Sequence, residues 1–362
     1  MSVLDDVSRY RHEIATDSYT TTWREIIGQY KDGDLKIDPE YQRLFRWDVD
    51  QQTQYVESLL LNIPSPPLFL AANQDGGFEV IDGLQRLSTM IRFFAAEVFD
   101  GNAPAVAHLS DEPDNNITVP LTLAEGPIIG SLSGFTAQTL PEALIRTIRY
   151  ARITIILLEK ESSPTARYEV FKRLNKQGAI LSDQEIRNCT ARLFGVEFPT
   201  ALREMGESVT IRSALQMSGE DERRMRVEEM ILRLLAFNHS QTAPRHEVSE
   251  FLDEFMIFAS EGKFRLTPEV RNRIEKTFEM IGTAFPDGKA FRFPRSGFST
   301  NLFDIVATGV YANLDNLDVE EFKKRHAQLL KSSQVSEVTG AGSNTRKKMI
   351  GRIELGMTWF AR

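Results

Sequence analysis

The chain has 362 residues, a formal net charge of −8 and 41% hydrophobic residues. This length suits two domains, and the acidic balance excludes a uniformly basic nucleic-acid-binding protein. A single cysteine, Cys189, excludes an internal disulfide framework and a cysteine-rich zinc site. No apolar run has the length of a membrane span and the N-terminus lacks the apolar core of a signal peptide, so we expect a cytoplasmic protein.

The polar N-terminal region predicts short helices and one short strand. Thr22 and Glu25 have the spacing of a capping box, which predicts the start of a helix in a region expected to be helical in part. Residues 35–38 predict a short strand that a proline ends. Asp48 and Gln51 form a second capping box and predict a further helix.

A hairpin followed by a helix is the clearest local pattern. Apolar residues over 68–72 and 78–81 flank a turn with two glycines, which is typical of two paired strands. Gly83 then interrupts the second strand. From residue 84 to 98 the apolar residues recur with helical spacing. The sequence therefore predicts a strand, a glycine turn and a helix in direct succession.

The middle of the chain combines an irregular segment, a strand and two helices. Residues 100–142 are rich in Gly, Pro, Asp, Asn and Ser, which indicates an irregular insertion or a mobile loop. The apolar run at 152–158 predicts a strand that is buried on both faces. A helix is expected over 163–178, and Ser182 with Glu185 forms a capping box at the start of the next one.

Beyond residue 187 nearly all of the sequence has helical periodicity. We therefore expect an α+β protein, with an α/β domain over residues 1–190 and a helical domain over 191–362. Cys189 lies beside an apolar helical face and is expected to be a small buried group. The five histidines lack the spacing of metal ligands.

The turn at Gly83 is a candidate anion site. The first N–H groups of a helix have no partner within the helix, and its dipole favours negative charge there. Gly83 allows close approach of the backbone, and Arg86 offers a fork of donors to phosphate. A structural interpretation stays open, in which Asp82 caps the helix, Gln85 is its reciprocal partner and the arginine is solvated or structural.

A second candidate segment precedes the hairpin. It contains Tyr41, Arg43, Arg46 and Trp47 within a few residues. Aromatic and guanidinium groups together suit phosphate contact and base stacking. They suit equally well a surface loop that is anchored by its buried aromatic side chains.

A third candidate segment lies at the end of the helix predicted over 163–178. Asn175 and Gly178 stand where a left-handed helix stop is expected. That structural role is one interpretation. In the other, Asn175 binds a nucleotide or orients a water molecule.

Local basic clusters are the remaining candidates for nucleic-acid contact, although each also suits a solvated face. The clusters are Arg146, Arg149 and Arg152; Arg223, Arg224 and Arg226; and Arg346, Lys347, Lys348 and Arg352. The sequence contains no P-loop, no dinucleotide-binding glycine motif and no nucleophile elbow. The common signatures for those chemistries are therefore absent from the sequence.

Three segments together carry a more specific pattern. Their residues are Pro39, Tyr41, Gln42, Arg43, Phe45 and Trp47 in the first; Ile81, Asp82, Gly83, Gln85, Arg86, Leu87 and Thr89 in the second; and Phe171, Arg173, Leu174, Asn175, Gly178, Leu181, Glu185, Ile186, Arg187 and Asn188 in the third. In order and spacing they resemble the N-terminal domain of GmrSD-type DNases, within the wider ParB/sulfiredoxin-like superfamily. The resemblance covers about residues 20–190.

The resemblance implies nucleotide-dependent action on DNA, in the restriction of foreign and often modified DNA. It implies that Asp82 holds a metal–nucleotide complex or positions the attacking water, that Gln85 orients this water and that Arg86 clamps phosphate. The implied cofactor is Mg²⁺ or Mn²⁺ with a nucleoside triphosphate, and Asp82 is the implied metal ligand. The other residues implied in nucleotide or phosphate binding are Gly83, Tyr41, Gln42, Arg43, Arg46, Arg173 and Asn175.

The chain departs from the family pattern at two positions and in one domain. Leu84 stands where the family has Gln, and Ser88 stands where it has Thr. Leu84 fits the apolar stripe of the predicted helix, which favours nucleotide binding over hydrolysis. Many family members also carry an HNH-type nuclease domain, whereas the histidines beyond residue 190 are not clustered as such a site requires.

We therefore expect a nucleotide-binding and NTP-hydrolysing protein that acts on or senses DNA in bacterial anti-phage defence. Two alternatives stay open. One is a non-catalytic, nucleotide-gated DNA clamp or partner-binding switch, and the other is a metal-dependent DNA nickase. The expected partners are DNA and a nucleoside triphosphate, with a second defence protein or a further copy of the chain, and no membrane.

Overall fold

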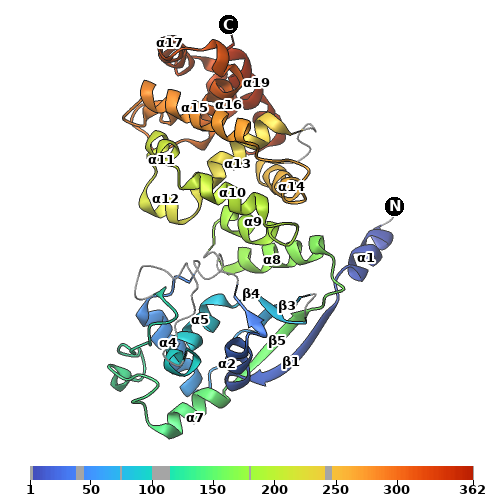
Figure 1. Cartoon of the computed structure of the whole chain (residues 1–362), viewed down its shortest axis with the longest axis vertical. Helices are drawn as coiled ribbons and strands as arrows, with labels where there is room; N and C mark the ends of the chain where they lie inside the picture. Colours follow the sequence, from blue (N-terminus) through green and yellow to red (C-terminus); the bar gives the residue numbers. More distant parts are fainter. Residues whose placement is uncertain are drawn as a thin grey trace. The chain divides into compact units, whose positions relative to one another are not determined.

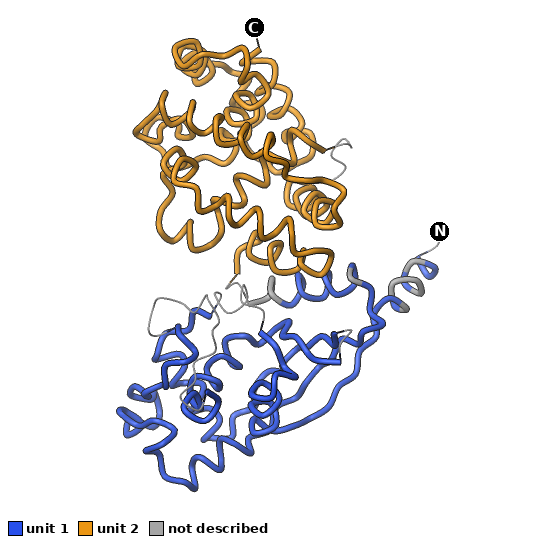
Figure 2. Tube along the Cα trace, in the orientation of Figure 1, with its two compact units in different colours: residues 1–178 blue, residues 179–362 orange. Residues whose placement is uncertain are grey.

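The computed structural model describes residues 3–37, 45–73, 76–99, 115–178, 181–240 and 247–361. The chain forms two compact units, residues 1–178 and 179–362, which Figure 2 distinguishes by colour. The first unit contains a sheet with helices, and the described part of the second is built from helices (Figure 1). This agrees with the predicted α+β class. The functional boundary at residue 190 stays a prediction.

The described sheet of the first unit has five strands in the spatial order β1-β5-β3-β4-β2. The strands are β1 (Thr16–Thr22), β2 (Leu35–Lys36), β3 (Leu68–Ala72), β4 (Phe78–Asp82) and β5 (Arg152–Leu158). The pairs β1–β5 and β3–β4 are antiparallel, and the pairs β3–β5 and β2–β4 are parallel. The predicted hairpin of β3 and β4 is therefore confirmed, within a mixed sheet.

β1 was not predicted, because its sequence is polar. Its threonines are β-branched and suit a strand, and as an edge strand it keeps polar side chains in contact with water. It pairs along its whole length with β5, from Thr16 opposite Leu158 to Thr22 opposite Arg152. The predicted capping box at Thr22 is wrong, since its side chain makes no capping hydrogen bond to the helix that follows.

The burial of β5 differs from the prediction on one face. Ile153, Ile155 and Leu157 are buried, whereas Thr154 and Ile156 on the other face are half-buried. Alternate residues of a strand point to opposite faces, so the sheet has one fully covered face here. The predicted strand is confirmed, but complete burial of both faces is not.

The helices of the first unit include the four that capping and periodicity predict, and the one predicted over 84–98 is divided into two helices at Phe94. They are α1 (Val3–His12), α2 (Trp23–Asp32), α4 (Val49–Leu60), α5 (Leu84–Phe93), α6 (Ala95–Val98), α7 (Glu142–Tyr150) and α8 (Pro164–Gly178). Asp48 and Gln51 form the predicted capping box of α4. α8 ends at Gly178, with Asn175 in its last turn, which confirms the predicted helix end.

The irregular segment after α6 is held against α4 over its described part, residues 115–141. Thr53 accepts a hydrogen bond from the backbone N–H of Ala124 at 2.9 Å. The buried carboxylate of Glu57 accepts from the backbone N–H groups of Ile128 and Ile129 at 2.9 and 2.5 Å. Polar side chains on the inner face of α4 therefore satisfy a loop that lacks regular backbone pairing.

The second unit confirms the predicted helical C-terminal region within the described residues. Its helices are α9 (Asp183–Ala191), α10 (Glu197–Gly206), α11 (Val209–Leu215), α12 (Gly219–Arg223), α13 (Arg226–His239), α14 (Val248–Ser260), α15 (Pro268–Ala284), α16 (Thr300–Asn313), α17 (Val319–Leu329), α18 (Ser333–Thr339) and α19 (Arg346–Trp359). The capping box of Ser182 and Glu185 begins α9, and Cys189 in that helix is buried, both as predicted.

Two helices of this unit cross in close contact. A Cβ atom at Gly309 of α16 would lie 2.4 Å from the carbonyl oxygen of Gly356 of α19. A Cβ atom at Gly356 would lie 2.3 Å from the carbonyl oxygen of Ile305. Both glycines are therefore required for the approach of the two backbones. In the described part of the chain, no helix combines the length and apolar character that a membrane crossing needs.

Candidate functional site

Gly83 joins β4 to α5 in a conformation that favours glycine. Its φ is 96° and its ψ is 14°, in the left-handed region. A Cβ atom there would lie 2.3 Å from Cδ2 of Leu68 on β3. Gly83 is the N-cap of α5, and no side chain caps this helix. The predicted cap by Asp82 with Gln85 is therefore wrong, because Asp82 is still the last residue of the strand.

The side chain of Arg86 is held by two partners. Its Nη2 lies 3.2 Å from Oδ2 of Asp82, and its Nη1 donates to the carbonyl oxygen of Pro66. The Arg86 side chain is 11% exposed and that of Asp82 is 33% exposed. Burial lowers the pKa of the Arg86 guanidinium, and the charge of Asp82 partly offsets this effect. Asp82, the predicted metal ligand, and Arg86, the predicted phosphate clamp, therefore form an ion pair with each other.

Gln85 joins two of the three predicted segments. Its Oε1 accepts hydrogen bonds from the backbone N–H groups of Arg46 at 2.8 Å and Trp47 at 3.1 Å. These residues lie 39 and 38 positions earlier in the sequence. The segment that precedes α4 is thereby fixed beside the start of α5. The position of Arg46 depends directly on the Gln85 side chain.

Further polar groups, which the sequence analysis does not identify, hold the same segment. Gln52 on α4 donates to the carbonyl oxygen of Trp47 at 2.7 Å, and Arg92 on α5 donates to Oε1 of Gln52 at 2.9 Å. Asn115 donates to the carbonyl oxygen of Phe45 at 2.6 Å. Gln52 lies one helical turn before the buried Val56, on the inward face of α4. A polar residue at an inward helical position is the sequence signal that could have indicated this role.

Two tryptophan rings pack against Tyr55, which lies near Arg86. The ring of Tyr55 lies 5.7 Å from that of Trp47 and 6.1 Å from that of Trp23, measured between centroids. The hydroxyl of Tyr55 is 3.0 Å from that of Ser65. Burial raises the pKa of Tyr55 to about 12, although the charge of Arg86 opposes this shift. Tyr55 is therefore a neutral hydrogen-bonding group at neutral pH.

The remaining predicted site residues are not joined to this arrangement by the structure. Tyr41, Gln42 and Arg43 lie outside the described residues, as does the side chain of Asn175. Arg173 lies on α8 with 79% of its side chain exposed, and its described ion pair is with Glu169 at 3.7 Å. These roles stay predictions.

Asp82 is the carboxylate at the turn that a divalent cation could use as a ligand. Within the described residues, no three His, Cys, Asp or Glu side chains gather as a metal site requires. Mg²⁺ in nucleotide sites, however, takes one or two carboxylates and fills its shell with phosphate oxygens and water. Asp82 alone therefore fits a cation that arrives with a nucleotide, and does not fit a metal held by protein ligands only.

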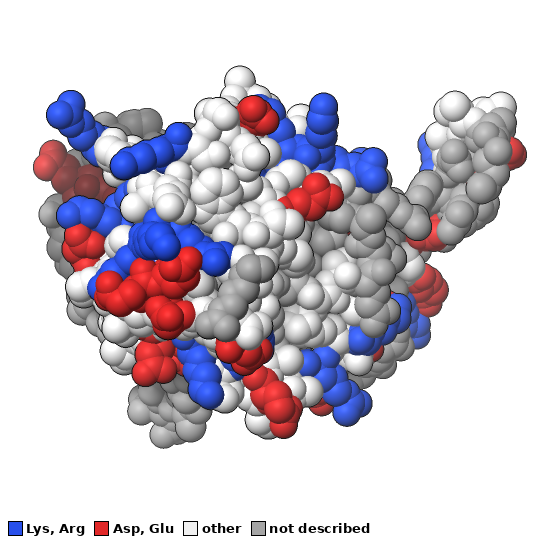
Figure 3. All heavy atoms as spheres, turned by 90° about the horizontal axis from the view of Figure 1, so that it is seen from above, with Lys and Arg blue, Asp and Glu red and all other residues white. Residues whose placement is uncertain are grey.

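Ion pairs with acidic side chains partly neutralise the predicted basic clusters. Arg149 pairs with Glu97, and Arg224 pairs with Glu220 at 3.1 Å. Arg352 is fully buried and bonds to Asp304 at 2.9 Å, so its assignment to a surface cluster is wrong. Acidic and basic side chains both occur on the face shown in Figure 3, which is not uniformly basic.

Comparison with known proteins identifies one family. Residues 24–191 match the family model described as the GmrSD restriction endonuclease, N-terminal domain. No curated protein and no solved structure matches the chain. The matched range contains the Arg46–Trp47 segment, the Gly83 turn and all of the third predicted segment. Residues 24–191 thus resemble the N-terminal domain of GmrSD restriction endonucleases, which confirms the resemblance inferred from the three segments.

Proposed function

We propose that this protein acts on DNA in restriction-type defence against phage and binds a nucleoside triphosphate at the Gly83 turn. The DNA substrate and the defence role are supported by the family description, which names a restriction endonuclease. The nucleotide is supported by one local observation. A strand, a left-handed glycine and a helix N-terminus lie beside the largely buried guanidinium of Arg86.

The backbone supplies the first part of the phosphate site. The N–H groups at the start of α5 have no acceptor within the helix, and the helix dipole favours negative charge there. Since Gly83 has no side chain, a phosphate oxygen can approach this backbone closely. The same lack of a side chain lets β3 pack against the turn through Leu68.

The ion pair of Asp82 and Arg86 supplies the second part. A phosphate at the turn would attract Arg86 and would be repelled by Asp82, so the free ion pair opposes nucleotide binding. Mg²⁺, when bound with the nucleotide, would supply positive charge that neutralises the phosphates. Asp82 would then hold the cation, and Arg86 would be released to donate its fork of N–H groups to phosphate.

Gln85 has a positioning role in this proposal. Its Oε1 is already engaged by the N–H groups of Arg46 and Trp47. It therefore acts on the nucleotide through the segment that it fixes, which brings Arg46 to the site. Gln85→Ala should weaken nucleotide binding less than Arg86→Ala does, because it removes an anchor and leaves the charge in place.

An isothermal titration of the protein with ATP and GTP in the presence of Mg²⁺ tests this site. Arg86→Ala should weaken binding by about tenfold or more, the cost of one charged hydrogen bond. Arg146→Ala serves as the control, because it removes an arginine of the same unit whose side chain is 73% exposed. Equal binding by Arg86→Ala and the wild type would exclude this site.

A switch without hydrolysis is the second candidate, and Leu84 favours it. This half-buried residue stands where the family pattern has Gln, at the first position of α5. A leucine can pack there but cannot orient water. Measured phosphate release from bound nucleotide separates the two functions: tight binding without turnover supports the switch, and turnover supports the hydrolase.

A further inference from the structure

The second unit contains a pocket of about 640 Å³ that the Gly83 site does not use. A pocket of this volume suits a small molecule. It is lined from α9, α13, α14 and α16, and by the segments that precede α16 and α19. All of its lining residues belong to the second unit.

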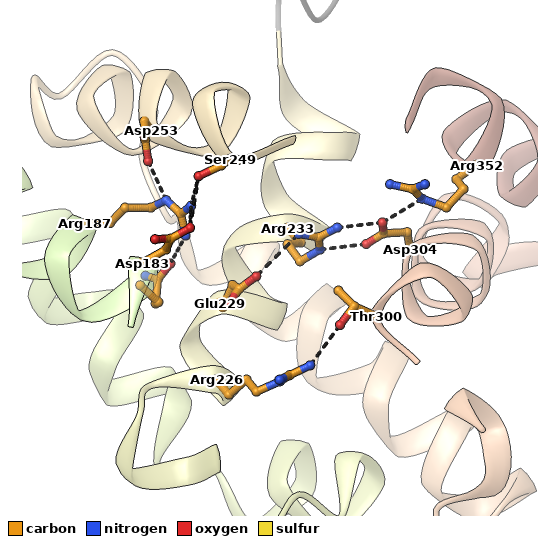
Figure 4. Close-up of polar contacts among 11 residues, drawn as sticks. Asp183, Arg187, Arg226, Glu229, Arg233, Ser249, Asp253, Thr300, Asp304 and Arg352 are labelled. Carbon is orange, nitrogen blue, oxygen red and sulfur yellow. Dashed lines mark hydrogen bonds and ion pairs between the residues drawn. The ribbon is translucent and has the colours of Figure 1, made fainter. Parts of the chain in front are cut away.

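Two buried arginines line this pocket (Figure 4). Arg187 on α9 is 3% exposed and donates to Asp253 at 2.6 Å, to Ser249 at 2.9 Å and to Gln184 at 3.3 Å. A guanidinium has five N–H donors, and these bonds engage three of them. Its Nη2 also lies 3.8 Å from Oδ2 of Asp183, so two carboxylates flank this guanidinium. That distance is longer than a hydrogen bond, and among the described residues one hydrogen on each Nη atom of Arg187 has no acceptor within hydrogen-bond distance.

Arg233 on α13 has a similar arrangement. Its side chain is 6% exposed, and it forms a two-point contact with Asp304 at 2.8 and 2.7 Å. Its Nη1 also donates to Glu229 at 3.4 Å. Asp304 is fully buried and bonds to Arg352 as well, so this carboxylate fixes the position of Arg233 from behind. Two buried and oriented guanidinium groups thus contribute to one pocket.

Three helices also begin at the pocket. Asp183 is the first residue of α9, Val248 of α14 and Thr300 of α16, and all three line the pocket. A serine side chain accepts one of the first N–H groups of α9 and one of α16, and no side chain caps α14. The remaining first N–H groups lack acceptors within the helix and carry the positive end of its dipole. Together with the buried guanidinium groups, they favour a negatively charged group in the pocket.

The more exposed charges of the pocket have the opposite sign. Asp183 is 52% exposed, Glu229 is 24% exposed and Glu247 is exposed. A ligand with many negative charges would meet these carboxylates as well as the arginines. A ligand with one anionic group and several hydroxyl donors would satisfy both, since carboxylates accept hydrogen bonds from sugar hydroxyls. Within the described residues, these acids do not form a three-ligand metal site.

We propose that the pocket binds a phosphorylated sugar, with its phosphate at Arg187 and Arg233 and its hydroxyls at Asp183, Glu229 or Glu247. A free nucleoside monophosphate and the 5′-phosphorylated end of a nucleic acid strand share this chemistry. The arginine pairs also connect helices of the unit, and a purely structural role predicts no ligand. The proposal is independent of the nucleotide site at Gly83.

The test is a titration of the full chain with adenosine 5′-monophosphate, adenosine and inorganic phosphate. Adenosine 5′-monophosphate should bind about tenfold or more tightly than adenosine, as expected for charged hydrogen bonds to phosphate. Arg86→Ala serves to locate the ligand, because loss of monophosphate binding in this variant would place the ligand at the Gly83 turn and not in the pocket. Equal binding of the two compounds, or saturation by none of the three, would overturn the proposal.

Asn301→Asp is the variant that identifies the pocket. Asn301 lines the pocket at the second position of α16, where a helix N-terminus tolerates a carboxylate. The new charge opposes phosphate, so binding of adenosine 5′-monophosphate should weaken by about tenfold or more. Gln334→Glu is the matched control, because it adds the same charge at the second position of α18, outside the pocket.

If Asn301→Asp binds the monophosphate as tightly as the wild type does, the ligand does not lie in this pocket. Loss of monophosphate binding in Arg86→Ala would contradict the pocket site as well. Competition by short oligonucleotides with and without a 5′-phosphate then identifies the source of the ligand. Preferential competition by the phosphorylated strand supports a nucleic acid end. Competition by neither strand, with the mononucleotide still bound, supports a free ligand.

Discussion

At the scale of single residues, Gly83 combines a left-handed backbone with a close contact. Gly33, the C-cap of α2, has a similar φ of 84°, but apart from its chain neighbours no atom lies within 4 Å of the position of its Cβ. A side chain at Gly33 would therefore meet backbone strain alone, whereas a side chain at Gly83 would meet both backbone strain and a steric clash. Backbone strain of this kind costs roughly 1 kcal/mol.

Gly83→Ala should accordingly destabilise the protein more than Gly33→Ala does. The second substitution adds strain of about 1 kcal/mol, whereas the first adds strain and a clash with Leu68, for a total of about 2–4 kcal/mol. The free energy of unfolding in denaturant measures both effects. Equal losses would show that the contact with β3 relaxes without cost.

Glu228 on α13 predicts a dependence of stability on pH. Burial raises its pKa to about 7, although the charges of Arg203 and Arg212 oppose this shift. The folded state therefore retains a proton that the unfolded state releases near its ordinary value of 4.5. The stabilisation is complete below this value and is lost as the pH rises through about 7.

Glu228→Gln should remove this dependence and stabilise the protein at pH 8, where the wild type buries a charge. Unfolding free energies at pH 5 and pH 8 measure the change. Glu320→Gln, at an exposed position of the same unit, should keep the pH dependence of the wild type. If the free energy of unfolding of Glu228→Gln still falls between pH 5 and pH 8, other groups cause the pH dependence.

At the scale of elements, the crossing of α16 and α19 depends on glycine. Gly356→Ala should destabilise the second unit by about 1–3 kcal/mol, because its Cβ would meet the backbone of Ile305. Gly282→Ala in α15 should have the opposite effect. Its Cβ would meet Ala214 at an ordinary 3.6 Å, and alanine in a helix is about 0.5–1 kcal/mol more favourable than glycine.

Thermal unfolding of the two variants checks both signs. A stable Gly356→Ala protein would indicate that the two helices separate without loss of packing. A destabilised Gly282→Ala protein would indicate that the contact with α11, which contains Ala214, has no room for a methyl group. Either result would contradict the packing described here.

Elements with local signals were predictable from the sequence. The capping boxes at Asp48 and Ser182 begin helices, and the hairpin of β3 and β4 follows from its glycine turn and apolar runs. β1 was missed because its pairing with β5 joins residues far apart in the chain, and its polar sequence has no apolar alternation. The ParB/sulfiredoxin-like relation stays a prediction.

The candidate site was predictable to a similar extent. The glycine turn was recognised because its cause is local, in that a strand has to pass into a helix. The role of Gln85 was not recognised, because its acceptor atom is used by Arg46 and Trp47, far away in the sequence. Spacing within one helix cannot reveal such a partner.

At the scale of the whole molecule, the family match and the structural units divide the chain differently. The match covers residues 24–191, whereas the second compact unit begins at residue 179. Helix α9 belongs to both, and through Arg187 it contributes to the pocket of the second unit. The matched segment therefore contributes to both candidate phosphate sites.

The binding of a triphosphate together with a cation, which we propose at the Gly83 turn, depends on the charges of Asp82 and Arg86. In the wild type, Mg²⁺ should strongly increase the affinity for ATP. Without Mg²⁺, Asp82 repels the phosphates and holds the Arg86 guanidinium in an ion pair. Asp82→Asn should bind ATP without Mg²⁺ about tenfold or more tightly than the wild type does, since it removes one nearby negative charge.

The decisive measurement is therefore the affinity of the wild type and of Asp82→Asn for ATP, each with and without Mg²⁺. The site described here predicts tighter binding by the variant without Mg²⁺ and a smaller gain from Mg²⁺. Equal affinity of the two proteins without Mg²⁺, or no binding by either under any condition, would contradict it.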